Sequence, residues 1–204
     1  YMTINGIKFG FVSYTYATNQ IVSDQNQAKV ALFNRPSDRK MTQDYKDLLT
    51  KEVTQTRENC DILIAMMHTY EISKQQEDVS KLLSDLGVDI IIGNHPHCSQ
   101  TMEWINNKTL CMYSLGNFVS ADPIVDRTHQ EFKNAYNVSM MVSLDIVKEN
   151  HQFSIQNINY TPIINYYDQN LENFKLIPYD QYTSQYETTH YHYQNGLTKK
   201  WIEE

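Results

Sequence analysis

The hydrophobic positions in the first half of the chain alternate between short continuous runs and repeats at helical spacing. Apolar runs rich in β-branched residues occupy residues 7–14, 62–67 and 88–92. Such runs are typical of strands buried on both faces of a sheet. Between them, apolar residues recur every three or four positions, which predicts helices over 41–58 and 74–86. The pattern therefore predicts an α/β fold.

Strands connected through a helix run parallel, with a right-handed crossover. We therefore expect strands 62–67 and 88–92 to be parallel. Ligands bind beyond the carboxyl ends of such strands. Polar residues stand at four of these ends: the loop 15–19, His68, the His95/His97 pair, and Asn117 after the strand 110–114.

The pattern changes after residue 122. Apolar residues alternate over 137–147 and again over 151–160, which predicts an antiparallel hairpin with one buried face. We expect a loop over 162–178 and a short helix or a loose tail over 179–204. The many tyrosines there are interpreted as surface packing. His190 and His192 repeat the spacing of the first histidine pair, but no strand leads into them, so they receive little weight.

Composition limits the possible partners. The net charge is −7 over 204 residues, and no Lys/Arg cluster is longer than Lys199–Lys200. This balance argues against a nucleic-acid partner and against direct electrostatic capture of a polyanion. The three cysteines lack the spacing of a zinc site. No apolar run approaches the length of a transmembrane helix.

The segment His95-Pro96-His97 carries the candidate chemistry. Gly93 permits a sharp exit from the preceding strand, and Pro96 favours an extended conformation at His95. Residues i and i+2 of an extended segment point the same way, so the two imidazoles are expected to converge. Imidazole is a common metal ligand, which makes this pair half of a metal site. The alternative is a polar loop in which the histidines only form hydrogen bonds.

Several motifs together resemble the CapA-type poly-γ-glutamate capsule synthesis family, which belongs to the calcineurin-like metallophosphatase superfamily. The resemblance extends over about residues 5–180 and is carried by segments with the family's order and approximate spacing. These segments are Tyr14-Thr15-Tyr16-Ala17-Thr18-Asn19, Met67-His68-Thr69-Tyr70-Glu71, Ile91-Ile92-Gly93-Asn94-His95-Pro96-His97, Met102-Glu103-Trp104 and Tyr113-Ser114-Leu115-Gly116-Asn117-Phe118. One departure is that Thr69-Tyr70 replaces the family's Trp-Gly, so that Glu71 arrives one position early.

The resemblance implies part of a metallophosphatase-like α-β-β-α sandwich, with a mixed sheet, a parallel strand-helix-strand unit and a C-terminal antiparallel hairpin. It makes residues 1–161 the C-terminal half of that domain and 162–204 a loop and tail packed on it. The family site holds two divalent metal ions. The resemblance then assigns His68, His95 and His97 as metal ligands, Glu103 and Asn117 as supporting residues, and Tyr16 and Asn19 as the pocket rim.

The resemblance also implies a function and partners. The family's early motifs, which supply metal-binding aspartates and an Asn-His pair, have no counterpart in this sequence. We therefore expect a C-terminal portion that relies on an upstream segment of the same fold, is anchored through it at the extracytoplasmic cell envelope, and by itself binds metal weakly or not at all. The implied activity is that of a metal-dependent hydrolase in capsule biosynthesis, working with membrane proteins of capsule synthesis. The alternative is a non-catalytic assembly or export component.

Overall fold

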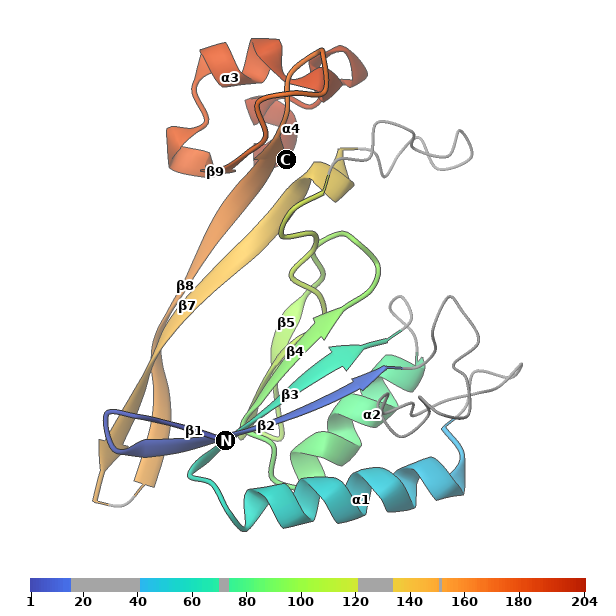
Figure 1. Cartoon of the computed structure of the whole chain (residues 1–204), viewed down its shortest axis with the longest axis vertical. Helices are drawn as coiled ribbons and strands as arrows, with labels where there is room; N and C mark the ends of the chain where they lie inside the picture. Colours follow the sequence, from blue (N-terminus) through green and yellow to red (C-terminus); the bar gives the residue numbers. More distant parts are fainter. Residues whose placement is uncertain (16–40, 70–73, 121–133, 151) are drawn as a thin grey trace. The chain divides into compact units, whose positions relative to one another are not determined.

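The computed structural model describes residues 1–15, 41–69, 74–120, 134–150 and 152–204 (Figure 1). The chain forms two compact units. Unit 1 contains Tyr1–His95 and Gln100–Ser114, and unit 2 contains Pro96–Ser99 and Leu115–Glu204. Residue 161, where the sequence analysis places a domain boundary, lies inside a strand of unit 2. The predicted division into a family domain and a tail stays a prediction.

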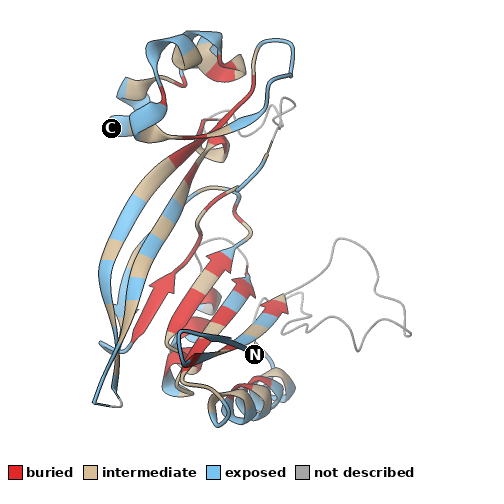
Figure 2. Cartoon of the chain, turned by 60° about the vertical axis from the view of Figure 1, so that its left-hand side comes forward, coloured by how far each residue is buried: buried red, intermediate tan, exposed pale blue. Residues whose placement is uncertain are grey.

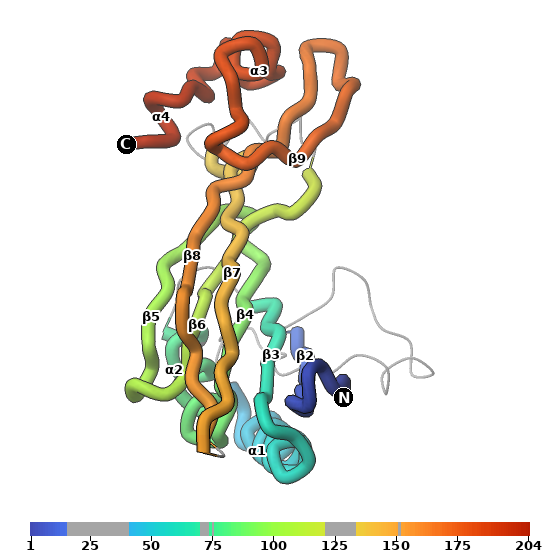
Figure 3. Tube along the Cα trace, turned by 90° about the vertical axis from the view of Figure 1, so that its left-hand side faces the viewer, coloured from blue at the N-terminus to red at the C-terminus, as the bar shows by residue number. Residues whose placement is uncertain are grey.

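Unit 1 is built on a mixed sheet with the strand order β1-β2-β3-β4-β6-β5. Strands β2, β3, β4 and β6 are parallel, and β1 and β5 pair antiparallel at the two edges (Figure 3). The strands are β1 (Met2–Ile4), β2 (Ile7–Thr15), β3 (Ile62–His68), β4 (Ile90–Asn94), β5 (Met102–Ile105) and β6 (Thr109–Met112). The predicted parallel pairing of strands 62–67 and 88–92 is confirmed.

Two helices cover one face of this sheet. Helix α1 (Gln43–Arg57) and helix α2 (Lys74–Asp85) match the predicted helical repeats. Their apolar faces pack on the central strands and form a core. Buried residues are coloured red on the ribbon in Figure 2. This core includes Leu49, Val53, Leu63, Ala65, Val79, Leu83 and Ile91. Within the described ranges, no helix is both long enough and apolar enough to span a membrane.

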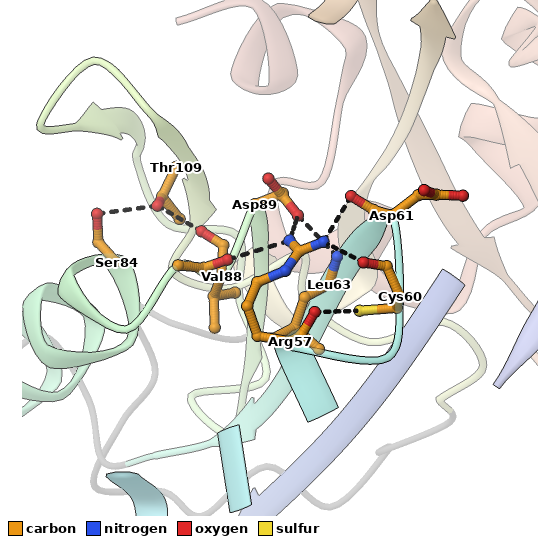
Figure 4. A network of polar contacts seen from close by, with 9 residues as sticks. Arg57, Cys60, Asp61, Leu63, Ser84, Val88, Asp89 and Thr109 are labelled. Carbon is orange, nitrogen blue, oxygen red and sulfur yellow. Dashed lines mark hydrogen bonds and ion pairs between the residues drawn. The ribbon is translucent and has the colours of Figure 1, made fainter. Parts of the chain in front are cut away.

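Arg57, the last residue of α1, ties that helix to the starts of two strands (Figure 4). Its Nη1 donates to Asp89 Oδ2 at 2.6 Å, and its Nη2 donates to the carbonyls of Cys60 and Asp61, each at 2.6 Å. Asp89 Oδ2 also accepts a bond from the Leu63 amide at 2.7 Å. The Arg57 guanidinium thus links the C-terminal end of α1 to the amino ends of β3 and β4.

Unit 2 contains the predicted hairpin. Strand β7 (Val138–Glu149) pairs antiparallel with β8 (Gln152–Tyr166), with a register shift between Ser143 and Asp145. Half-buried and exposed bands alternate along most of both strands (Figure 2). The α/β fold with a mixed sheet and a C-terminal antiparallel hairpin is therefore confirmed.

The C-terminal segment is more ordered than the sequence predicted. The expected loop over 162–178 is wrong, because β8 continues to Tyr166 and β9 (Lys175–Pro178) pairs with it. Of the two alternatives for 179–204, short helices are observed: η4 (Tyr179–Gln181), α3 (Ser184–Thr189), η5 (Tyr191–Asn195) and α4 (Lys199–Glu203). Another single turn, η3 (Ala135–Asn137), precedes β7.

Three tyrosines of this segment lie in the core. Tyr167 and Tyr182 are fully buried, and Tyr182 packs with Ile164, Tyr166 and Ile177. The expectation of surface packing is therefore wrong for Tyr166, Tyr167 and Tyr182. A tyrosine ring supplies a large apolar area while its hydroxyl needs a polar partner. Composition alone does not distinguish these two uses of the side chain.

Candidate metal centre

A group of polar residues in unit 1 lies at the carboxyl ends of three adjacent parallel strands. Strand β2 ends at Thr15, β3 at His68 and β4 at Asn94. In the strand register, Thr15 is opposite His68, and His68 is opposite Asn94. His95 follows Asn94 directly. The sheet topology therefore gathers these residues at one edge, as the alternation of strands and helices predicted.

His68 is held between two neighbours. Its Nδ1 lies 3.0 Å from Thr15 Oγ1, and its Nε2 lies 3.2 Å from Nδ1 of His95. The two imidazole rings meet edge to face, with centroids 4.7 Å apart and an interplanar angle of 90°. A neutral imidazole carries one proton on one of its two nitrogens. If His68 Nδ1 carries the proton, the lone pair on Nε2 faces His95. The Thr15 hydroxyl can donate to Nδ1 or accept from it, so this contact orients the His68 ring without setting its tautomer.

His95 does not adopt the extended conformation expected before a proline. Its φ is +124°, and the φ of His97 is +59°. Both values lie in a region that L-residues with a side chain rarely adopt. The backbone amide of His95 donates to Asn94 Oδ1 at 2.8 Å, which supports this local shape. The predicted route to convergence, with both rings on one side of an extended segment, is therefore wrong.

Gly93 has a different role from the one expected. It lies inside β4 rather than in a turn, and its φ is not positive. A Cβ at this position would lie 2.0 Å from the carbonyl oxygen of Tyr113. Only glycine permits this close approach of the two backbones, which seats the end of β4 immediately before Asn94 and His95.

The separation of the His68 and His95 nitrogens fits a shared metal ion. Two nitrogens each about 2.1 Å from one zinc ion at the tetrahedral angle are about 3.4 Å apart. The observed 3.2 Å fits that arrangement and also fits a hydrogen bond between two neutral rings. Within the described ranges, no group of three or more His, Cys, Asp or Glu side chains is arranged to hold a metal ion. The pair alone does not make a complete metal site among the described residues, and its assignment as metal ligands stays a prediction.

His97 belongs to unit 2, where Asn117 holds it. Its Nδ1 lies 2.7 Å from Asn117 Oδ1, and the Asn117 amide nitrogen donates to the Tyr136 carbonyl at 3.1 Å. The His97 and Tyr136 rings also meet edge to face at 6.1 Å. Asn117 is therefore a direct partner of one predicted ligand. The predicted convergence of His97 with the other two histidines stays a prediction.

Glu103 has a tyrosine as its partner. It is exposed on the edge strand β5, and its Oε1 accepts the Tyr113 hydroxyl at 2.5 Å. Burial of the ring and this bond together raise the pKa of Tyr113. The bond links β5 to Tyr113, whose carbonyl oxygen packs against Gly93. The predicted role of Glu103 in orienting a ligand imidazole stays a prediction.

Three residues singled out from the sequence lie outside the described residues: Tyr16, Asn19 and Glu71. Two contributors were not singled out from the sequence: Thr15, which entered only as the start of the polar loop 15–19, and Asn94. Each is the last residue of a strand and stands directly beside a predicted site residue, so strand-end position was the signal that could have found them.

Comparison with known families and proteins places the chain. The sequence model described as "Bacterial capsule synthesis protein PGA_cap" matches residues 1–122, more than half of the 204. The chain belongs to the PGA_cap family. The match includes all three candidate histidines as well as Glu103 and Asn117, so the resemblance noted from the motifs is confirmed.

Two relatives carry capsule names. The PGA biosynthesis protein CapA of Bacillus subtilis is 25% identical over 124 residues, covering 58% of this chain and 30% of that protein. The capsule biosynthesis protein CapA of Bacillus anthracis is 29% identical over 128 residues, covering 58% of this chain and 28% of that protein. The matched region thus spans less than a third of either relative.

Two solved structures are similar at low identity. A structure described as a novel phosphatase from Mycoplasma pneumoniae aligns with a TM-score of 0.48 at 14% identity, covering 80% of this chain and 56% of that one. A hypothetical protein from Thermus thermophilus aligns with a TM-score of 0.43 at 14% identity, covering 78% of this chain and 60% of that one.

Proposed function

We propose that this PGA_cap chain contributes ligands to a divalent-metal centre of a capsule biosynthesis protein at the cell envelope, and that the complete centre hydrolyses a phosphate ester or a related bond. The observation that carries the proposal is the His68–His95 pair. Its ring nitrogens lie 3.2 Å apart at the carboxyl ends of neighbouring parallel strands. The unusual φ of His95 adds weight, because backbone strain is concentrated at functional sites.

The residues of this chain have separate roles in the proposal. His68 and His95 hold the ion through neutral nitrogens, and Thr15 keeps the His68 ring in the orientation that its Nδ1 contact defines. His97, the third predicted ligand, is held by Asn117 within unit 2. A bound divalent ion polarises an ester oxygen and lowers the pKa of a bound water. Carboxylate ligands come from polypeptide outside the described residues.

The capsule assignment draws support from the relatives. Both are named as capsule or PGA biosynthesis proteins, which favours a role outside the cytoplasm in making or handling an envelope polymer. A non-catalytic role in assembly or export with no metal chemistry makes the opposite prediction for the histidines, since their replacement would then leave metal affinity unchanged. The two proposals are separated by one measurement.

That measurement is calorimetric titration of the 204-residue chain with Zn²⁺ or Mn²⁺. We expect His68→Ala and His95→Ala each to weaken binding at least about tenfold, because each removes one direct ligand. The control is His151→Ala, which removes a histidine that is not a predicted ligand. Equal affinities for all four proteins would refute the metal centre.

A further inference from the structure

The tautomer of His97 can be assigned from its neighbours. The Asn117 amide nitrogen donates to the Tyr136 carbonyl oxygen, which is an acceptor only. This bond fixes the orientation of the amide, so the atom that faces His97 is the oxygen Oδ1. An oxygen there requires a proton on His97 Nδ1. The neutral ring therefore keeps its lone pair on Nε2, the nitrogen that is directed away from Asn117.

Asn165 holds the loop that carries Asn117. Its side-chain nitrogen donates to the Asn117 carbonyl at 3.0 Å, and its Oδ1 accepts the Ser120 amide at 3.0 Å. One amide side chain is thus hydrogen-bonded to both ends of the short loop 117–120. Asn165 is only 3% exposed, so water does not compete effectively for these groups.

Asn165 is in turn held by the buried histidines of the tail. Nε2 of His190 lies 2.9 Å from the Asn165 carbonyl, and Nδ1 of His190 accepts the backbone amide of His192 at 2.9 Å. Because Nδ1 is an acceptor, Nε2 carries the proton and donates it to Asn165. His190 is fully buried. A continuous series of hydrogen bonds thus runs from the tail core to His97, entirely within unit 2.

We propose that Asn165 is a positioning residue for His97: anchored by His190, it holds the Asn117 loop so that neutral His97 stays in the Nδ1–H tautomer, with its lone pair on Nε2. This inference deepens the proposed function and rests on it. It gives the Tyr- and His-rich tail, far beyond His97 in the sequence, a purpose besides packing. A metal-ligating histidine commonly donates its other ring nitrogen to a supporting acceptor, which fixes its tautomer.

The test is two-bond ¹H–¹⁵N correlation of the histidine rings in the metal-free 204-residue chain, at a pH where they are neutral. In the unmodified chain we expect His97 in the Nδ1–H form and His190 in the Nε2–H form. In Asn165→Ala and in the isosteric Asn165→Asp, which lacks the donor to the Asn117 carbonyl, the Nδ1–H form of His97 should fall from the predominant to the minor species. Asn117→Ala should cause the same loss directly.

His190 serves as the internal control for folding. Its acceptor is the backbone carbonyl of Asn165, which the substitutions keep, so its Nε2–H signal should persist in every folded variant. Asn159→Ala removes an exposed asparagine whose side chain donates to the Asn157 carbonyl, and it should leave His97 unchanged. An unchanged His97 in either folded Asn165 variant would overturn the proposal, as would an Nε2–H form of His97 in the unmodified chain. Because no metal is present, the result is independent of whether the proposed metal centre exists.

Discussion

At the scale of single residues, His190 makes the stability of unit 2 sensitive to pH. Burial is the main cause that lowers its pKa from 6.5 to about 4; His192 lowers it further, and the bond to the Asn165 carbonyl opposes the shift. Between these two pH values the unfolded chain takes up a proton that the folded chain does not. Stability is therefore lost as the pH falls from about 6.5 toward 4, by roughly 3 kcal/mol at full effect.

The measurement is urea unfolding of unit 2 between about pH 4 and pH 7, followed by tyrosine fluorescence, in the unmodified chain and in His190→Gln. Glutamine can donate to the Asn165 carbonyl and accept from the His192 amide, but it does not titrate. The variant should therefore lose less stability on acidification. Parallel pH profiles for the two proteins would show that His190 takes up its proton equally in the folded and unfolded chains, which would contradict its burial without charge.

The sequence correctly predicted that His68 and His95 lie at the same edge of the sheet, but it did not predict the backbone conformation of His95. The strand pattern brought His68 and His95 to one edge of the sheet, where their rings make contact. It could not foresee the positive φ of His95, because that conformation depends on the Asn94 side chain and on the end of β4. Nor could it foresee Asn165, which contacts Asn117 from 48 positions away. Contacts at such a separation leave no local pattern in the sequence.

At the scale of secondary-structure elements, the Arg57 cluster is the junction that fixes α1 against the sheet. Arg57→Ala removes charge-assisted bonds to the carbonyls of Cys60 and Asp61 and to the carboxylate of Asp89. The Arg57 and Asp89 side chains are 27% and 32% exposed, so solvent replaces part of what is lost. We expect a decrease of about 2–3 kcal/mol in the free energy of unfolding of unit 1.

The matched control is Lys81→Ala, which breaks an i,i+4 pair with Asp85 on the exposed surface of α2. Such pairs contribute about 0.5 kcal/mol or less. Urea unfolding of the two variants should therefore separate them clearly. If Arg57→Ala lowers the free energy of unfolding no more than Lys81→Ala does, the Arg57 cluster does not stabilise unit 1 more than an exposed ion pair.

Elements were predictable where a single burial pattern extends along them. The helices α1 and α2 and the half-buried parts of β7 and β8 have one apolar face, so their sequences show periods of about 3.6 or 2. The pattern is lost at the end of β8, where Ile163–Tyr166 are buried on both faces. The short helices of the tail have too few residues to show a period. Their fold is set by the buried tyrosines and histidines that they bring together.

At the scale of the whole molecule, family membership and the charge of the candidate ligands lead to different expectations about the number of metal ions that the chain binds. The PGA_cap match covers the three candidate histidines, yet all three are neutral ligands, and no larger group of candidate ligands occurs among the described residues. Two divalent cations held close together repel each other strongly unless carboxylates offset their charge. A pair of imidazoles can hold one ion but gives no compensation for a second.

We therefore predict that the 204-residue chain, dialysed extensively after loading with Zn²⁺, retains at most one ion per chain and shows little phosphoesterase activity. Elemental analysis with the His68→Ala variant as control gives the stoichiometry, and the retained ion should disappear in that variant. Retention of two ions per chain would contradict the prediction. It would mean that carboxylates of this chain outside the described residues, such as Glu71 or Asp122, act as ligands, and Glu71→Gln and Asp122→Asn would then each release one ion.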